Sequence, residues 1–129
     1  MNDRTVREIL VIEDEPMIAL EVETAVREAG FEAVTIVHSV ASALRAIDDR
    51  VVHAAILDAN LRGESAAPVA ARLRARRIPF IVVTGQSANE VGDWLEDARV
   101  VAKPFSMRKL VETIMAVAEG TVESRSPEA

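Results

Sequence analysis

The chain has 129 residues, of which 50% are apolar and 28% are charged, a composition typical of one globular domain. It contains no cysteine, which excludes disulfides, thiolate nucleophiles and thiolate metal sites. The formal net charge of −6 at pH 7 disfavours non-specific nucleic-acid binding, and no apolar run is long enough to span a membrane. Since the first residues also lack a positive-then-apolar leader, we expect a cytoplasmic protein with no nucleic-acid or membrane partner.

Short apolar runs alternate with amphipathic segments along the chain. The runs predict buried strands at residues 9–12, 33–37, 54–57, 80–83 and 100–102. Helices are predicted from Pro16 to the residue before Gly30, after the N-cap Ser39, over residues 66–76, and from the N-cap Ser106 to a stop at Gly120. Around residues 86–96, few apolar side chains and a central glycine predict only a short or mobile helix.

The alternation of strands and helices predicts a doubly wound α/β domain over residues 1–120, followed by a flexible C-terminal tail over residues 121–129. We expect a five-stranded parallel sheet of the flavodoxin-like (βα)5 type, with strand order 2-1-3-4-5. In open sheets of this kind, ligands bind outside the carboxyl ends of the strands, where the strand order reverses. Residues that follow the strands are therefore the candidates for a functional site.

Four of the predicted strands end in a residue that phosphate chemistry can use: Glu13-Asp14, Asp58, Thr84 and Lys103. Because parallel strands point their carboxyl ends the same way, we expect these side chains to converge. Two carboxylates ~4 Å apart repel by about 4 kcal/mol at an effective dielectric constant of about 20, so such a cluster favours a bound cation. Oxygen ligands without histidine or cysteine suit Mg²⁺.

Such a site allows a carboxylate to be phosphorylated. The metal ion would neutralise charge on the incoming phosphoryl group while Asp58 attacks in line. The Lys103 ammonium would hold a second phosphoryl oxygen, and the Thr84 hydroxyl would donate to a third. Taken singly, each residue has an ordinary alternative: acids at the positive end of a helix, turn residues, and a surface lysine. Their coincidence at one sheet edge favours the joint interpretation.

Residues 8–119 resemble the receiver domains of two-component response regulators. The resemblance implies that Asp58 is the phosphoacceptor. It implies that Asp14 binds Mg²⁺ directly, that Glu13 acts through water, and that Asn60 contributes its backbone carbonyl. It further implies a histidine kinase or histidine phosphotransfer protein as donor and an unidentified downstream protein as reader. We expect a monomer or weak homodimer that catalyses only its own phosphorylation and dephosphorylation.

By the same resemblance, Thr84 is the switch hydroxyl and Lys103-Pro104 is a lysine followed by a cis-proline junction. Asn60 and Gln86 would flank the water that hydrolyses the phosphoryl group. Both are uncharged amides able to hydrogen-bond that water, so we expect self-dephosphorylation at a moderate pace.

The output region departs from the family pattern. Val100 stands where most receivers have an aromatic residue that moves with the switch threonine. Thr84-Gly85 is similar to a group of stand-alone bacterial receivers with the motif Phe-Ala-Thr-Gly, although Val82-Val83 replaces its first two residues. We therefore expect phosphorylation to act by ordering residues 86–97, with Trp94 as a candidate anchor for a partner.

Two other functions stay open from the sequence. The first is a phosphorylation-independent interaction module on the same fold, with a vestigial acidic pocket. The second is a phosphohydrolase with an aspartyl-phosphate intermediate. The haloacid-dehalogenase pattern typical of that second class has an acid two residues after the nucleophile, where this chain has Asn60.

Two histidines and a group of arginines are interpreted as structural or surface residues. His38 and His53 are expected outside the acidic edge, one after the second strand and one before the third. The arginines could form a local basic face. They lie near the carboxyl end of a predicted helix, however, where solvated cations are typical. These arginines are Arg72, Arg74, Arg76 and Arg77.

Overall fold

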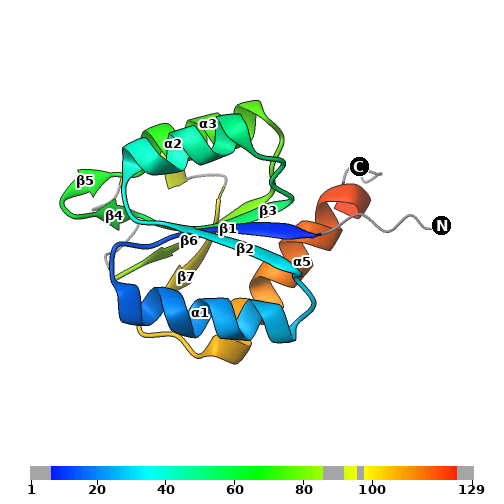
Figure 1. The fold of residues 1–129 in the computed structure, drawn as a ribbon. Coiled ribbons are helices and arrows are strands. Elements are labelled where there is room, and N and C mark those ends of the chain that lie inside the picture. The colour runs from blue at the N-terminus through cyan, green and yellow to red at the C-terminus, as the bar shows by residue number, and fades with distance from the viewer. Residues whose placement is uncertain (1–6, 86–91, 96–97, 125–129) are drawn as a thin grey trace.

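The computed structural model describes residues 7–85, 92–95 and 98–124. Within them, one parallel sheet contains β1 (Glu8–Ile12), β2 (Ala33–Val37), β3 (Ala54–Asp58), β6 (Phe80–Thr84) and β7 (Arg99–Ala102). The order across the sheet is β2-β1-β3-β6-β7. Numbered along the chain, these five strands have the order 2-1-3-4-5, which confirms the prediction. All carboxyl ends lie along one edge of the sheet, at the left in Figure 1.

Helices cover both faces of this sheet. They are α1 (Pro16–Glu28), α2 (Val40–Asp49), α3 (Ala67–Ala75) and α5 (Met107–Ser124). Figure 1 shows α2 and α3 on one face and α1 and α5 on the other, which is the predicted doubly wound arrangement. In the part of the chain that the structure describes, none of the helices is both long and apolar enough to cross a membrane.

The central strands are apolar on both sides because each side faces a helical layer. In β1, Leu10 and Ile12 pack into the cluster beneath α2 and α3, while Ile9 and Val11 pack into the cluster beneath α1 and α5. All four side chains are fully buried. Full burial of such a side chain stabilises the fold by about 1.5–3 kcal/mol. The continuous apolar run thus fixes the strand between two cores and leaves the polar residues that follow it at the sheet edge.

The helix starts follow their sequence signals. Ser39 Oγ accepts the N–H of Ser42 at 3.1 Å at the start of α2. Ser106 Oγ accepts the N–H of Lys109 at 3.0 Å at the start of α5. These are N-cap hydrogen bonds, each of which satisfies a backbone donor that the first helical turn leaves unpaired.

The helix ends follow the sequence less closely. Helix α1 ends before Gly30, which has φ +117, a conformation that favours glycine. The predicted stop at Gly120 is wrong, because α5 continues to Ser124. A glycine within a helix costs about 1 kcal/mol relative to alanine and does not by itself end the helix. Residues 125–129 of the predicted tail lie outside the described residues.

Between β6 and β7 the described residues form the short 3₁₀ helix η1 (Asp93–Leu95). Leu95 is buried, and Trp94 packs partly buried against the same core cluster as α2 and α3. Residues 86–91 and 96 of the predicted weak segment lie outside the described residues, as does residue 97 of the range expected to become ordered.

A hairpin that none of the sequence patterns above predicts follows β3 directly. Strand β4 (Asn60–Leu61) pairs antiparallel with β5 (Glu64–Ser65) through a two-residue loop. The loop residues Arg62 and Gly63 have φ +56 and +83, as is typical of a type I′ turn. Leu61 is 1% exposed and anchors the hairpin in the core. Figure 1 shows the hairpin beyond the carboxyl ends of the sheet strands.

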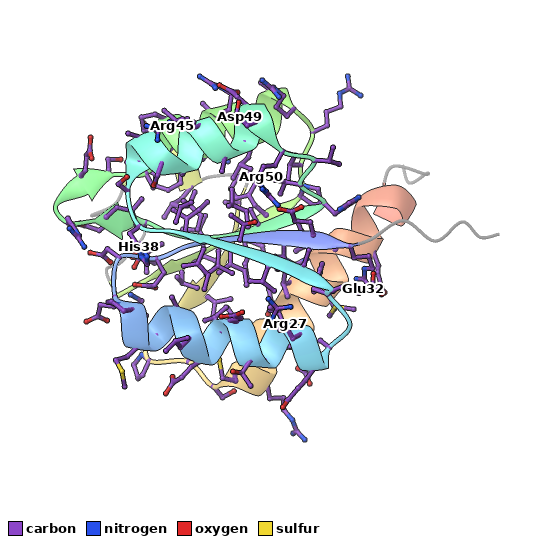
Figure 2. The ribbon with its side chains drawn as sticks, in the orientation of Figure 1. Arg27, Glu32, His38, Arg45, Asp49 and Arg50 are labelled. Atoms are coloured by element: carbon purple, nitrogen blue, oxygen red, sulfur yellow. The ribbon has the colours of Figure 1, made fainter. Side chains whose placement is uncertain are left out.

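Polar contacts also stabilise the amino end of β1, which lies at the sheet edge opposite the hairpin. Glu8 accepts a hydrogen bond from Arg50 Nε at 2.6 Å, and this bond holds the pKa of Glu8 below its ordinary value despite partial burial. His53 Nδ1 accepts the N–H of Glu8 at 3.0 Å, so His53 has a structural contact. His38 follows the carboxyl end of β2, away from Arg50 (Figure 2).

Candidate functional site

Three carboxylates meet at the carboxyl edge of the sheet. The β1–β3 register pairs Ile12 with Leu57, so the residues that follow them, Glu13 and Asp58, lie side by side. One carboxylate oxygen from each of Glu13, Asp14 and Asp58 lies within 4.8 Å of the others. Glu13 and Asp58 are 3% and 4% exposed. The register therefore gathers the acids singled out in the sequence into one largely buried cluster.

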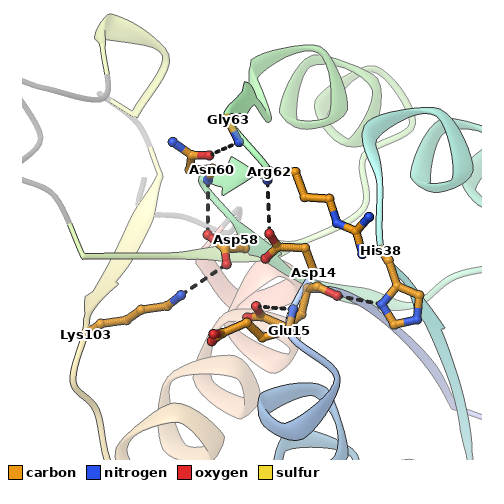
Figure 3. Close-up of polar contacts among 9 residues, drawn as sticks. Asp14, Glu15, His38, Asp58, Asn60, Arg62, Gly63 and Lys103 are labelled. Atoms are coloured by element: carbon orange, nitrogen blue, oxygen red, sulfur yellow. Dashed lines mark hydrogen bonds and ion pairs between the residues drawn. The ribbon is translucent and has the colours of Figure 1, made fainter.

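Asp58 is held from two sides (Figure 3). Lys103 Nζ donates to Asp58 Oδ2 at 3.1 Å, and the N–H of Asn60 donates to Asp58 Oδ1 at 3.1 Å. Lys103 follows β7 and bonds back to β6 through its own N–H, which donates to the Thr84 carbonyl at 2.8 Å. The Lys103-Pro104 peptide bond is cis. The neighbouring strands β3, β6 and β7 thus bring Asp58, Thr84 and Lys103 to one place.

Backbone contacts orient the acidic pair. Glu13 Oε2 accepts the N–H of Glu15 at 3.1 Å, and Asp14 Oδ2 accepts the N–H of Arg62 at 3.0 Å. His38 Nδ1 lies 2.9 Å from the Glu13 carbonyl oxygen. Because a carbonyl oxygen can only accept, the Nδ1–H of His38 donates this hydrogen bond. His38 therefore lies beside the acidic edge, contrary to the placement expected from sequence. The reason is that β2 ends next to β1, where the Glu13 N–H donates to the Val37 carbonyl.

The buried charges perturb one another. Burial, together with the charge of Asp58, raises the pKa of Glu13 to about 8, so Glu13 is mostly protonated at neutral pH in the metal-free protein. Partial burial opposes the charged form of Lys103, but the hydrogen bond to Asp58 and the nearby carboxylates outweigh it and raise the Lys103 pKa. Lys103 therefore stays charged and offsets only part of the negative charge of the acids.

This cluster fits a hard divalent cation. Its donors are carboxylate oxygens, which suit Mg²⁺ better than softer metals. The raised pKa of Glu13 shows that the cluster does not carry its full negative charge unless a cation compensates it. A cleft of about 360 Å³ opens beside the carboxylates. Its lining residues are Asp14, Glu15, Asp58, Asn60, Thr84, Gly85 and Lys103.

The remaining residues singled out in the sequence have different surroundings. Asn60 Oδ1 accepts the N–H of Gly63 at 2.7 Å, so the turn uses one of the two lone pairs of this oxygen. Val100 is 38% exposed on β7 at the sheet edge. The Trp94 Nε1–H is buried and lacks a hydrogen-bond acceptor among the described residues. Gln86 lies outside the described residues.

Three of the four clustered arginines make intramolecular contacts. Arg72 and Arg76 form ion pairs with Asp48 of α2 at 2.6 and 2.7 Å. Arg74 donates to the Trp94 carbonyl at 2.9 Å. These side chains connect α3 to α2 and to η1, which supports the structural interpretation over a basic binding face.

The model of the response regulator receiver domain matches residues 9–115. The chain belongs to this family. This receiver domain is 36% identical over 113 residues to the sensory transduction protein RegX3 of Mycobacterium tuberculosis (strain ATCC 25618 / H37Rv). The match covers 84% of the chain and 49% of RegX3, so the chain spans about half the length of the curated relatives it matches.

Solved receiver structures are also similar. The solution structure of SdrG from Sphingomonas melonis Fr1 matches with a TM-score of 0.76 and 39% identity, covering 91% of this chain and 99% of SdrG. The receiver domain of the sensor histidine kinase PA1611 from Pseudomonas aeruginosa PAO1 matches with a TM-score of 0.75 and 26% identity, covering 89% and 99%. The PA1611 structure has a magnesium ion coordinated in its active site cleft.

Two contacts at the site were not anticipated from sequence, those of His38 and of Arg62. The contact of Arg62 depends on the β4–β5 hairpin. The sequence does contain a signal for this hairpin, the glycine in the two-residue loop Arg62-Gly63. A two-residue loop with glycine is typical of tight β-hairpins. The position of His38 has no local sequence signal, because it follows from the pairing of β1 with β2.

Proposed function

We propose that this receiver domain accepts a phosphoryl group on Asp58 from a histidine kinase or a histidine phosphotransfer protein, with Mg²⁺ as cofactor. The observation that carries the proposal is a buried carboxylate that bonds an ammonium at 3.1 Å and has two further acids within 4.8 Å. Membership of the receiver family supports a role in two-component signalling. The magnesium ion in the related PA1611 domain supports the choice of metal.

The residues divide the chemistry between them. An Asp58 carboxylate oxygen forms a bond to phosphorus as the N–P bond of the donor phosphohistidine breaks, and the histidine nitrogen afterwards takes up a proton. Lys103 transfers its hydrogen bond from Asp58 to a phosphoryl oxygen and neutralises part of the charge there. Thr84, on the strand between those of Asp58 and Lys103, donates a hydrogen bond from its hydroxyl to another phosphoryl oxygen.

Four residues supply the metal site in this proposal. Asp14 and Asp58 would hold the ion through carboxylate oxygens, Asn60 would hold it through its backbone carbonyl, and Glu13 would act through water. Mg²⁺, when bound, neutralises negative charge shared by the phosphoryl group and the acids. The cluster offers the oxygen donors that this ion prefers.

The signal would pass by protein contact within the cytoplasm. Asn60 and Gln86 would set its lifetime by bonding the hydrolytic water. Trp94 is packed against the core, so a partner that uses it as an anchor requires the segment around it to rearrange. The proposal holds whether or not further domains are attached to the chain.

Incubation with acetyl phosphate, with and without Mg²⁺, followed by intact mass measurement, tests the proposal. We expect the mass of one phosphoryl group to be gained only with Mg²⁺. Asp58→Asn should gain none, while Asp49→Asn, a matched loss of charge at an exposed position on α2, should behave like the wild type. An unmodified wild type would contradict the proposal and indicate a phosphorylation-independent module. Turnover of external phosphate esters would indicate a phosphohydrolase.

A further inference from the structure

We propose that the β4–β5 hairpin positions the Asp14 carboxylate for Mg²⁺, an inference that rests on the proposed metal-dependent function. The Arg62 N–H at the hairpin tip donates to Asp14 Oδ2 at 3.0 Å, although the two residues are 48 positions apart in the chain. The hairpin thus holds the Asp14 carboxylate, which offers an oxygen within 4.8 Å of one from Glu13 and one from Asp58.

A chain of hydrogen bonds connects this contact to the phosphoacceptor (Figure 3). The Asn60 N–H donates to Asp58 Oδ1 at 3.1 Å, and Asn60 Oδ1 accepts the N–H of Gly63 at 2.7 Å. Because Arg62 then bonds Asp14, the hairpin bridges two of the three acids in the cluster. A change in the hairpin tip should therefore alter how firmly the Asp14 carboxylate is held.

The hairpin has a fixed base and a conformationally demanding tip. Leu61 and Ala66 are buried in the core, and the Ala66 N–H donates to the Ala59 carbonyl at 3.1 Å. At the tip, Gly63 has φ +83, and a Cβ added there would meet no atom within 4 Å. A Cβ at this position therefore meets no steric clash, and the main effect of a substitution there is on the backbone conformation.

The positive φ and open surroundings of Gly63 allow the effect of the hairpin on Asp14 to be tested without changing the packing of the core. Gly63→Val disfavours the positive φ strongly, because β-branched residues rarely adopt it, whereas Gly63→Asn tolerates it. Loss of the tip geometry removes the N–H that orients Asp14. Loss of an outer partner of a metal ligand weakens metal affinity by about 10- to 100-fold, and we expect an effect of this size.

Titration with Mg²⁺ alone, in the absence of a phosphodonor, tests the inference on the full chain. We expect Gly63→Val to bind Mg²⁺ at least about tenfold more weakly than the wild type, and Gly63→Asn to bind nearly as the wild type does. Phosphorylation by acetyl phosphate at saturating Mg²⁺ should stay close to wild type in both variants, which a general loss of structure would not allow. Equal Mg²⁺ affinities of the two folded variants would overturn the inference.

A second measurement covers the case in which Gly63→Val does not fold. Asp14→Ala removes the acceptor of the Arg62 N–H, so the Arg62 amide should exchange its hydrogen faster while the amide of Leu61 at the anchored base changes little. Unchanged exchange at Arg62 would overturn the inference. This exchange measurement needs no metal and therefore tests the hairpin contact by itself. A wild type that binds no Mg²⁺ would instead contradict the proposed function.

Discussion

Binding of Mg²⁺ to this receiver domain should expel a proton from Glu13. Without metal, burial and the charge of Asp58 raise the Glu13 pKa to about 8, so about nine molecules in ten carry this proton at pH 7. A divalent cation in the cluster favours the ionised carboxylate, so the proton leaves when the ion binds. We therefore expect about 0.9 proton released per Mg²⁺ at pH 7 and about 0.1 at pH 9.

Calorimetric titration with Mg²⁺ in two buffers of different ionisation enthalpy measures this proton count. The apparent affinity should rise about tenfold between pH 6 and pH 7 and level off above about pH 9. Glu13→Gln has no proton to release at this position, so its heats and affinity should be nearly independent of buffer and pH over that range. Equal binding heats of the wild type in the two buffers at pH 7 would refute the reasoning.

The same shift gives the metal-free protein a pH-dependent stability. Because the folded pKa of Glu13 lies above the ordinary value of 4.5, its contribution is fully present below about pH 4.5 and is lost as pH rises through about 8. At about 1.4 kcal/mol per pKa unit, the loss has an upper limit of about 5 kcal/mol. Chemical denaturation in EDTA should show this decline in the wild type and a smaller decline in Glu13→Gln.

Metal affinity, signal lifetime and output each provide a further test. Asp14→Ala should weaken Mg²⁺ binding more than Glu13→Ala, because only Asp14 is expected to contact the ion directly, and equal dissociation constants would contradict this. Gln86→Leu should slow the loss of a phosphoryl label by removing an amide that bonds the hydrolytic water, whereas an unchanged rate rejects that role. Amides of residues 86–97 should exchange more slowly with Mg²⁺ and beryllofluoride than without them. High protection there in both states would contradict an ordering mechanism.

The main features of the site could be predicted because they follow from the direction of parallel strands. Apolar runs such as 54–57 identify buried strands, and the residue after each run, such as Asp58 or Lys103, must lie at the common carboxyl edge. Cap residues could be predicted because their hydrogen bonds are local, as at Ser39. Neither inference depends on how distant side chains pack.

The features that were missed depend on contacts far apart in the chain or on competing local effects. The Arg62–Asp14 contact needs a tight hairpin with a non-glycine residue at φ +56, which sequence propensity disfavours. The Glu13 pKa depends on burial by the assembled sheet and on the neighbouring Asp58. At Gly120 the preference against helix is only about 1 kcal/mol, and α5 extends through it.

The most direct test of the central claim is to locate the phosphoryl group. Borohydride reduces an acyl phosphate of aspartate to homoserine, and tandem mass spectrometry then identifies the altered position. After treatment with acetyl phosphate and Mg²⁺, we predict homoserine at position 58 and an unaltered Glu13 and Asp14. A reduced residue at either of those acids, or a phosphoryl group on a serine, threonine or histidine side chain with Asp58 unmodified, would contradict the account.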